Sequence, residues 1–208
     1  MSRACPPLPA EDLAHVLKHT GAHWESLRGK RLFITGGTGF FGMWLLETFA
    51  HANTALNLGA EAVVLTRDPA AFARKAPHLS GRADLTCVAG DVRDFDFPPG
   101  VFSHIIHAAT TSGAPVSADE MTATILGGTC RVLDFAGRAG AARLLYVSSG
   151  AVYGPQPPEL DRIPEDCAGE PPIGDAHAYG RGKRAAEALC LDAWKAGGAA
   201  PVLSLIHI

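Results

Sequence analysis

The chain has 208 residues, 47% of them hydrophobic and 19% charged, which is ordinary for one globular domain or slightly more. Its formal net charge of −3 excludes a strongly basic nucleic-acid binder and provides no attraction to anionic membranes. No apolar run reaches the roughly 18 residues that a membrane-spanning helix needs. We therefore expect a globular protein that binds a small molecule rather than nucleic acid or a membrane.

The cysteines indicate a reducing compartment. Their number is odd, their spacings are wide and no CxxC pair occurs, so neither a disulfide framework nor a zinc ribbon is expected. The N-terminus lacks the apolar stretch of a signal peptide. These features predict a cytoplasmic protein. The five cysteines are Cys5, Cys87, Cys130, Cys167 and Cys190.

Helix-like and strand-like segments alternate along the chain. A short amphipathic helix over 11–19 comes first, and later helices carry apolar residues on a 3.6-residue period. The helix that starts at Phe40 is expected to place Phe41, Trp44 and Phe49 in the core. Strands separated by helices predict a parallel sheet with helices on both faces, the doubly wound α/β class. We expect strands at 31–35, 62–66, 85–89, 103–107, 144–148 and from Pro201 onward, and helices at 40–51, 69–76, 116–139 and 178–195.

A glycine-rich loop follows the first expected strand and opens the next helix. It fits GxGxxG at Gly37, Gly39 and Gly42, and GxxGxxG when Gly36 replaces Gly37 as the first position. Glycine permits a tight turn and lets the backbone approach a pyrophosphate, while the helix N-terminus presents free N–H groups to phosphate. No Gly-Lys-Ser/Thr follows, which excludes a P-loop. The strand before the loop and the helix after it therefore predict dinucleotide binding.

The residues after the second and third strands bear on the kind of dinucleotide. A carboxylate at the second strand tip binds the ribose 2′-hydroxyl of NAD, whereas an arginine accommodates the 2′-phosphate of NADP. Arg67 stands at this tip and favours NADP slightly, while the adjacent Asp68 keeps NAD open. Asp91 follows the third strand, where it either contacts adenine or caps a turn.

A tyrosine and a lysine four residues apart open the last expected helix. Tyr179 and Lys183 share one helix face, so their hydroxyl and ammonium groups can converge. Free tyrosine has a pKa of about 10, and a nearby cation favours the phenolate, which then serves as a general acid and base. Ser149 ends the fifth strand and can hydrogen-bond the same substrate oxygen. We predict that these three residues are catalytic.

Together these segments resemble an extended short-chain dehydrogenase/reductase of the NAD-dependent epimerase/dehydratase type, over about residues 30–196. The resemblance implies that Ser149, Tyr179 and Lys183 form the catalytic trio and that Lys183 also holds the nicotinamide ribose. The motifs that carry it are TGGTGFFG at 35–42, GDVRD at 90–94, HAAT at 107–110, SSGAVYG at 148–154 and YGRGK at 179–183.

The resemblance also implies a set of cofactor contacts. The three glycines at the family's positions would hold the pyrophosphate, Asp91 and Val92 would border adenine, and Ala108 and Ala109 would border the central part of the cofactor. The full set of expected contacts is Gly36, Gly39, Phe40, Phe41, Gly42, Arg67, Asp91, Val92, Ala108, Ala109, Thr110, Tyr179 and Lys183.

Two departures from the family pattern narrow the reaction. Gly150 and Ala151 stand where the family's 4,6-dehydratases carry Asp-Glu, which argues against that reaction and leaves an epimerase or a reductase. Thr124 stands where the family often has an asparagine that contacts the cofactor.

His107 is interpreted as a structural residue near the cofactor rather than a base. No metal is expected, because His15, His19 and His23 fit a solvated helix face.

The resemblance divides the chain into three parts. Residues 1–29 form a helical extension, and residues 30–202 form a Rossmann-type NAD(P)-binding domain without the substrate region of extended members. Residues 203–208 match the translation of a widely used transposase sequencing adapter and are expected to be a non-native tail. The 208-residue chain is then expected to bind NAD(P) but to be inactive alone.

The expected activity is that of an NAD(P)-dependent epimerase or reductase acting on a nucleotide sugar or a related hydroxyl or keto substrate. Tyr179 would take the proton from a hydroxyl as hydride moves to the nicotinamide. Two alternatives stay open: a non-catalytic NAD(P)-binding regulator on the same fold, and a ketone reductase of the dihydroflavonol type. By resemblance, the whole protein is expected to form a homodimer through the helices at 116–139 and 178–195.

Overall fold

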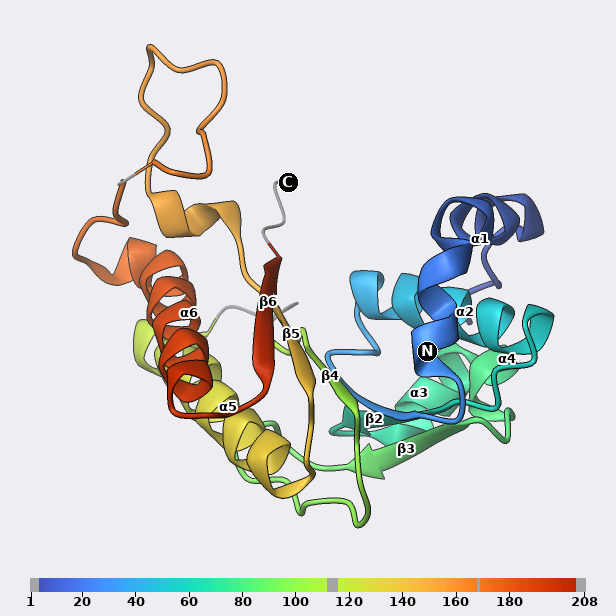
Figure 1. The fold of residues 1–208 in the computed structure, drawn as a ribbon. Helices are drawn as coiled ribbons and strands as arrows, with labels where there is room; N and C mark the ends of the chain where they lie inside the picture. The colour runs from blue at the N-terminus through green and yellow to red at the C-terminus, as the bar shows by residue number, and fades with distance from the viewer. Residues whose placement is uncertain (1–3, 112–115, 168, 205–208) are drawn as a thin grey trace.

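The fold is a six-stranded parallel sheet with helices on both faces (Figure 1). The computed structural model describes residues 4–111, 116–167 and 169–204, with no side chains described for 200–204. The strand order is β3-β2-β1-β4-β5-β6, and every neighbouring pair is parallel. This is the Rossmann order, with its switch point between β1 and β4. The strands are β1 (Arg31–Thr35), β2 (Glu61–Thr66), β3 (Leu85–Ala89), β4 (His104–His107), β5 (Arg143–Val147) and β6 (Ala200–Ser204).

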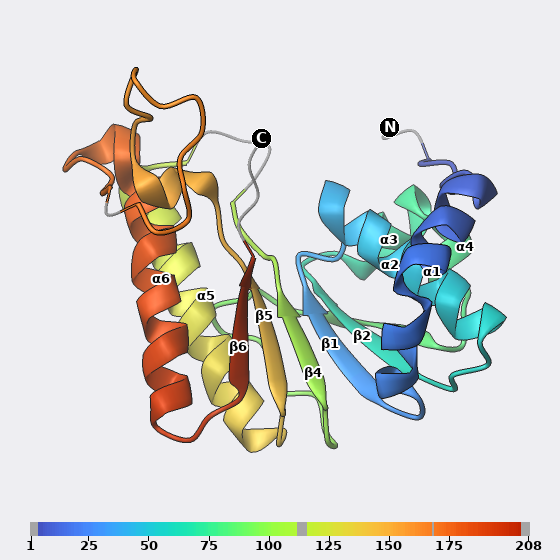
Figure 2. The same cartoon turned by 45° about the horizontal axis from the view of Figure 1, so that its top comes forward.

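The helices form two layers, one on each side of the sheet (Figure 2). One layer holds α1 to α4, and the other holds α5 and α6, which pack against each other. The helices are α1 (Ala10–Trp24), α2 (Phe40–Ala55), α3 (Pro69–Lys75), α4 (Pro77–Ser80), α5 (Ala118–Arg138) and α6 (Ala178–Lys195), with short 3-10 turns η1 (Glu25–Leu27), η2 (Gly150–Tyr153) and η3 (Asp175–His177).

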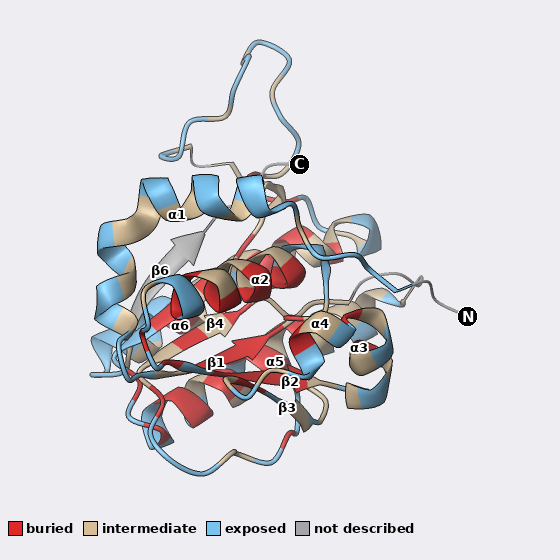
Figure 3. Cartoon of the chain, turned by 90° about the vertical axis from the view of Figure 1, so that its right-hand side faces the viewer, coloured by how far each residue is buried: buried red, intermediate tan, exposed pale blue. Residues whose placement is uncertain are grey.

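Alternation along the central strand builds the two halves of the core. Leu32 and Ile34 pack toward α2, whereas Phe33 packs toward α5, as successive side chains of a strand must. Figure 3 shows this buried material concentrated along β1, β2 and α2. On the α5 side the Phe33 ring lies 5.3 Å from Phe95 and 4.7 Å from Phe135, measured between centroids. Aromatic packing therefore fixes β1 against α5 and the loop after β3.

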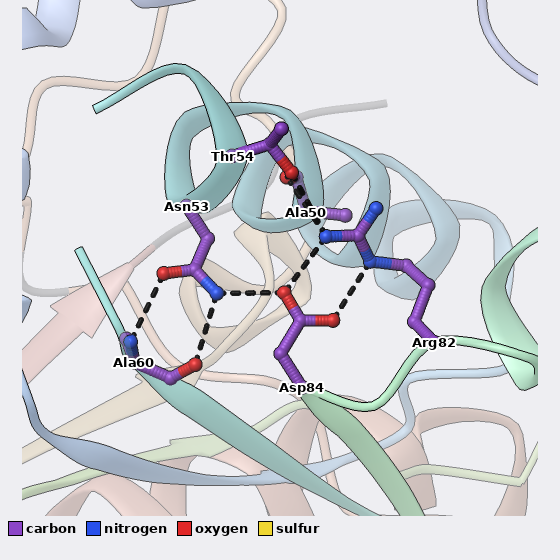
Figure 4. A network of polar contacts seen from close by, with 6 residues as sticks. All are labelled: Ala50, Asn53, Thr54, Ala60, Arg82 and Asp84. Atoms are coloured by element: carbon purple, nitrogen blue, oxygen red, sulfur yellow. Dashed lines mark hydrogen bonds and ion pairs between the residues drawn. The ribbon is translucent and has the colours of Figure 1, made fainter. Parts of the chain in front are cut away.

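A polar network ties the C-terminal end of α2 to the starts of β2 and β3 (Figure 4). Asn53 is 7% exposed, and its amide oxygen accepts from the Ala60 N–H at 3.0 Å. The Asn53 Nδ2 donates to the Ala60 carbonyl at 2.9 Å and to Asp84 Oδ2 at 2.6 Å. Arg82 then pairs with Asp84 through two contacts of 2.8 Å and also reaches Thr54 Oγ1 at 3.0 Å. This network fixes the loop between α2 and β2.

Most of the expected elements lie where the sequence predicts them, with limited differences at their ends. The N-terminal helix is longer than the predicted 11–19, and the short helix α4 and the 3-10 turns were not predicted. The predicted core position of Phe41 is wrong: its side chain is 43% exposed, because it stands in the first turn of α2 beside the glycine loop. Phe49 is 2% exposed and fits its core prediction, and Trp44 is half-buried.

Two further expectations, on the C-terminal tail and on the start of the long helix, are met only in part. The predicted tail at 203–208 begins inside β6, which ends at Ser204, and 205–208 lie outside the described residues. The helix predicted from residue 116 begins at Ala118. Within the described residues no helix is long and apolar enough to cross a membrane, and no cluster of three or more metal-binding side chains occurs.

Candidate functional site

The predicted site residues meet at the carboxyl ends of the parallel strands. They follow β1, β2, β3, β4 and β5 or open α6, so they lie along one edge of the sheet. The switch point between β1 and β4 is at the centre of this edge, and ligands of open α/β sheets bind there.

The glycine loop is tightly packed against the tip of β4 and against itself. Gly36 has φ of 75°, and a Cβ at this position would lie 2.5 Å from the Ala108 carbonyl carbon. A Cβ on Gly37 would lie 2.7 Å from Val64 Cγ1. A Cβ on Gly42 would overlap the Gly36 carbonyl oxygen. These three glycines are therefore required by the packing of the protein itself, whichever spacing motif they are assigned to.

Gly39 differs from the other loop glycines. A Cβ at Gly39 would meet only the Gly36 carbonyl oxygen, at 3.4 Å, so the protein leaves open space on that side. Gly39 is also the N-cap of α2, which has no side-chain cap hydrogen bond, and the next residue, Phe40, is 74% exposed. Free N–H groups and open space are what an approaching pyrophosphate requires. The cradle therefore fits a dinucleotide.

Lys75, which was not among the predicted site residues, holds this loop in place. Lys75, the last residue of α3, donates from Nζ to the Thr38 carbonyl at 2.6 Å. This bond joins the glycine loop to the helix after β2. Sequence spacing offered no signal for it, because the two residues are 37 positions apart.

The charged residues after β2 and β3 have distinct partners. Asp68 Oδ1 accepts from the Ala71 N–H at 2.8 Å and caps α3, while Arg67 is exposed. Asp91 Oδ1 accepts from the Arg93 backbone N–H at 3.0 Å and from its Nε at 2.7 Å. The hydrogen bond from the Arg93 guanidinium lowers the pKa of the Asp91 carboxyl, and the charge of Arg67 adds to that effect. Asp91 thus caps a turn, which was one of its two predicted roles.

Val92, expected beside adenine, packs against α5, and Ala108, expected beside the central part of the cofactor, is bonded to β1. Val92 is 8% exposed, and its Cγ1 would lie 2.9 Å from a Cβ on Gly128 in α5. Ala108 donates its N–H to the Thr35 carbonyl at 3.2 Å, which continues the pairing of β4 with β1. Within the described residues the buried Thr110 hydroxyl has no hydrogen-bond partner.

His107 lies in a buried chain of hydrogen bonds that crosses the switch point. Thr35 Oγ1 accepts from the Ala109 N–H at 3.1 Å and lies 2.8 Å from His107 Nδ1. On the other side, His107 Nε2 lies 3.1 Å from Thr129 Oγ1, whose hydroxyl donates to the Ile125 carbonyl at 2.7 Å. This order of donors places the imidazole proton on Nε2 and leaves Nδ1 as the acceptor.

The environment keeps this imidazole neutral. Burial lowers the pKa of His107 to about 3, and the positive charge of Lys183 acts in the same direction. A neutral histidine with both nitrogens engaged holds β1, β4 and α5 together, in line with the interpretation of His107 as structural rather than basic. Thr35 and Thr129 are the two hydrogen-bond partners of His107, and the sequence did not predict this role for either residue.

Lys183 is the only buried lysine in the described part of the chain, at 2% exposure. Its Nζ donates to the Val147 carbonyl at 2.8 Å, lies 4.8 Å from the Tyr146 ring centroid and 5.9 Å from the Tyr179 ring centroid. Burial lowers the pKa of Lys183 to about 8, against the opposing charge of Glu187. The ammonium group therefore lies between β5 and the tyrosine one helical turn earlier.

Ser149 and Tyr179 lie on two segments that are in contact. Ser149 is the N-cap of η2, and its Oγ accepts from the Ala151 N–H at 3.2 Å, which leaves the hydroxyl proton available for donation. A Cβ on Gly180 would overlap the Ala151 carbonyl oxygen, so the start of α6 lies directly on η2. Tyr179 also faces a pocket of about 270 Å³, which is lined by Ala151, Gly154, Pro155, Pro171, Ala176, His177, Tyr179 and Gly180.

Two known proteins are similar in sequence to this chain over most of its length. The chain is 32% identical over 165 residues to UDP-glucuronic acid decarboxylase 1 of Danio rerio, covering 77% of this chain and 37% of that protein. It is 29% identical over 170 residues to UDP-glucose 4-epimerase of Streptomyces lividans, covering 77% of this chain and 46% of that protein. The chain thus spans less than half the length of these relatives.

A solved structure shares both the fold and part of the sequence. The Bordetella bronchiseptica enzyme WbmG, solved in complex with NAD, superposes with a TM-score of 0.62 at 28% identity, over 84% of this chain and 52% of that one. Residues 32–207 match the family described as the NAD dependent epimerase/dehydratase family. That match covers most of the chain, and the glycine cradle and the Ser149, Tyr179 and Lys183 set lie within it. The chain therefore belongs to the NAD-dependent epimerase/dehydratase family.

Proposed function

We propose that the whole protein is an NAD(P)-dependent enzyme that oxidises or reduces a carbon of a nucleotide sugar, as an epimerase or a reductase. The observation that carries this proposal is the placement of Lys183 beside Tyr179, on a helix whose start lies on the turn capped by Ser149. The dinucleotide cradle lies along the same sheet edge. Two relatives are named as UDP-sugar enzymes, which supports a nucleotide sugar as the substrate class.

Each residue of the trio has a distinct chemical role in the proposal. When bound, the nicotinamide supplies the acceptor for hydride from the carbon that bears the reacting hydroxyl. Tyr179 takes the hydroxyl proton at its phenolate oxygen as the C=O bond forms, and returns it in the reverse direction. Ser149 donates a hydrogen bond from its hydroxyl to the same substrate oxygen and keeps its proton, and the Lys183 ammonium stabilises the negative charge on Tyr179.

Either NAD or NADP is compatible with the proposal, and we propose a modest preference for NADP. Asp68 already accepts a backbone N–H as the cap of α3, whereas Arg67 is exposed at the tip of β2. An arginine there suits a 2′-phosphate. Fluorescence titration of the full-length protein with NADPH and NADH tests the choice. We expect a lower Kd for NADPH and loss of that preference in Arg67→Ala; equal Kd values would contradict it.

The Tyr179→Phe variant of the full-length protein tests the catalytic proposal. Losing general acid–base catalysis is expected to lower kcat on UDP-glucose or UDP-glucuronic acid by about 10²- to 10⁴-fold, with the Kd for NAD(P)H unchanged. Tyr153→Phe is the matched control, because it removes a tyrosine hydroxyl from the adjacent turn. Turnover that survives Tyr179→Phe unchanged would refute the catalytic role. Net consumption of NADPH with substrate would favour a reductase over an epimerase.

A further inference from the structure

One arginine connects three segments around the proposed catalytic residues. Arg184 follows Lys183 on α6, and its Nη1 donates to the Val152 carbonyl in η2 at 3.1 Å. The same nitrogen donates to the Gly169 carbonyl, in the segment that returns from η2 toward α6, at 2.5 Å. Its Nη2 lies 3.5 Å from Glu170 Oε1. Arg184 is part of α6, and its side chain therefore links that helix to η2 and to the loop at 169–171.

Glycines allow these segments to approach at the level of the backbone. Gly154 has φ of 75°, and a Cβ there would overlap the Glu170 carbonyl oxygen. A Cβ on Gly169 would overlap the Tyr153 carbonyl oxygen in the same way. A Cβ on Gly180 would lie 3.2 Å from Pro171 Cγ, besides its contact with η2. The loop at 169–171 is thus packed between η2 and the first turn of α6.

The two carbonyl bonds, rather than the ion pair, give Arg184 its effect. The Glu170 side chain is 76% exposed, and an exposed pair of this kind contributes little. Bonds from a charged donor to backbone carbonyls are stronger and directional, and a guanidinium presents its donors in a fixed plane. A lysine ammonium on a flexible stem does not reproduce that geometry.

We propose that Arg184 is a positioning residue that holds Ser149 and Tyr179 in register for proton transfer, which rests on the proposed function. Ser149 caps the first turn of η2, and Arg184 binds the carbonyl of Val152 in the same short element. Tyr179 lies five residues before Arg184 on α6. Movement of η2 relative to α6 would therefore change the position of the serine hydroxyl against the phenolate. Arg184 acts through these two residues and does not touch the reacting atoms.

The test compares Arg184→Ala and Arg184→Lys with Arg138→Ala in the full-length protein. Arg138 is a matched control because it is an exposed arginine that pairs with Asp134 on α5. We expect Arg184→Ala to lower kcat on UDP-glucose or UDP-glucuronic acid by about 10- to 100-fold, as small misplacements do. The Kd for NAD(P)H should stay within about two-fold, since the glycine cradle is not among Arg184's partners. Added guanidinium ion should restore part of the lost kcat, and Arg184→Lys should remain impaired.

A second readout does not depend on activity. In protein labelled with 3-fluorotyrosine, the ¹⁹F resonances of Tyr153 and Tyr179 should shift or broaden in both Arg184 variants, while that of Tyr146 should not. Unchanged Tyr153 and Tyr179 resonances, or a kcat equal to wild type without guanidinium, would overturn the proposal. If Arg184→Ala does not fold, Arg184→Lys decides by the same criteria. A wild-type enzyme inactive on both sugars would contradict the proposed function, and the fluorine spectra alone would then decide the role of Arg184.

Discussion

Replacing His107 by glutamine should make the protein less sensitive to acid. The wild-type imidazole is 2% exposed, and burial with the charge of Lys183 lowers its pKa from 6.5 to about 3. The unfolded chain takes up a proton at this histidine as the pH falls through 6.5, whereas the folded protein does not do so until about pH 3. His107 therefore lowers stability progressively as the pH falls through that window, and has no such effect above it.

The size of the effect follows from the same two values. At about pH 5 the unfolded imidazole is almost fully protonated and the folded one almost fully neutral. Because pH 5 lies about 1.5 units below the unfolded pKa, the free energy of unfolding should be about 2 kcal/mol lower there than at pH 7.5. Glutamine does not titrate, so this part of the acid destabilisation should vanish. The substitution also weakens the hydrogen bonds to Thr35 and Thr129, and should cost about 1–3 kcal/mol at pH 7.5.

Urea unfolding followed by circular dichroism, at about pH 7.5 and pH 5, measures both quantities. His107→Gln should lose about 2 kcal/mol less than wild type between the two pH values, while being less stable at the higher one. His15→Gln is the control, because it removes a histidine on the exposed face of α1. The same acid-induced loss in His107→Gln as in wild type would refute the view that a neutral, buried His107 connects β1, β4 and α5.

Three further substitutions test the cradle and the fold. Gly36→Ala places a methyl group 2.5 Å from the Ala108 carbonyl carbon at a φ of 75°, so it should displace the β4 tip and raise the Kd for NAD(P)H at least about tenfold in a fluorescence titration. Gly39→Ala has room in the protein, so it should keep wild-type stability and still weaken cofactor binding; unchanged binding would contradict the proposed cradle. Asn53→Ala leaves the Ala60 N–H and carbonyl without their partner and should cost about 2–4 kcal/mol in urea unfolding, whereas a cost below about 0.5 kcal/mol would show that water replaces these bonds.

The order and type of the main elements were accessible from the sequence because local chemistry fixes them. The segments at 31–35, 85–89 and 178–195 match the observed β1, β3 and α6, where apolar runs or helical periods are bounded by glycine or other turn residues. The parallel, doubly wound sheet followed from the family resemblance and from the rule that links alternating strands and helices to parallel sheets.

The features that could not be predicted from the sequence depend on contacts between residues far apart in the chain. Phe41 fits the apolar period of α2, but it stands in the first turn of that helix beside the glycine loop and is exposed, so periodicity gave the wrong environment. The bonds of Lys75 to Thr38 and of Arg184 to Val152 join residues 37 and 32 positions apart and leave no local pattern. The prediction of Lys183 beside Tyr179 was accessible because spacing along one helix is a local property.

The distribution of buried polar side chains provides an independent argument for where the site lies. Burying such groups stabilises a fold less than apolar packing would, so a buried polar side chain usually has a role other than stability. Among the described residues, Glu47 and Asn53 on α2 fasten the N-terminal segment and the loop before β2. The other buried polar side chains lie beside the carboxyl ends of β1, β4 and β5, and they are Thr35, His107, Thr129, Ser148 and Lys183. A polar interior at the switch point is what the proposed site, which would orient a dinucleotide and control one proton, requires.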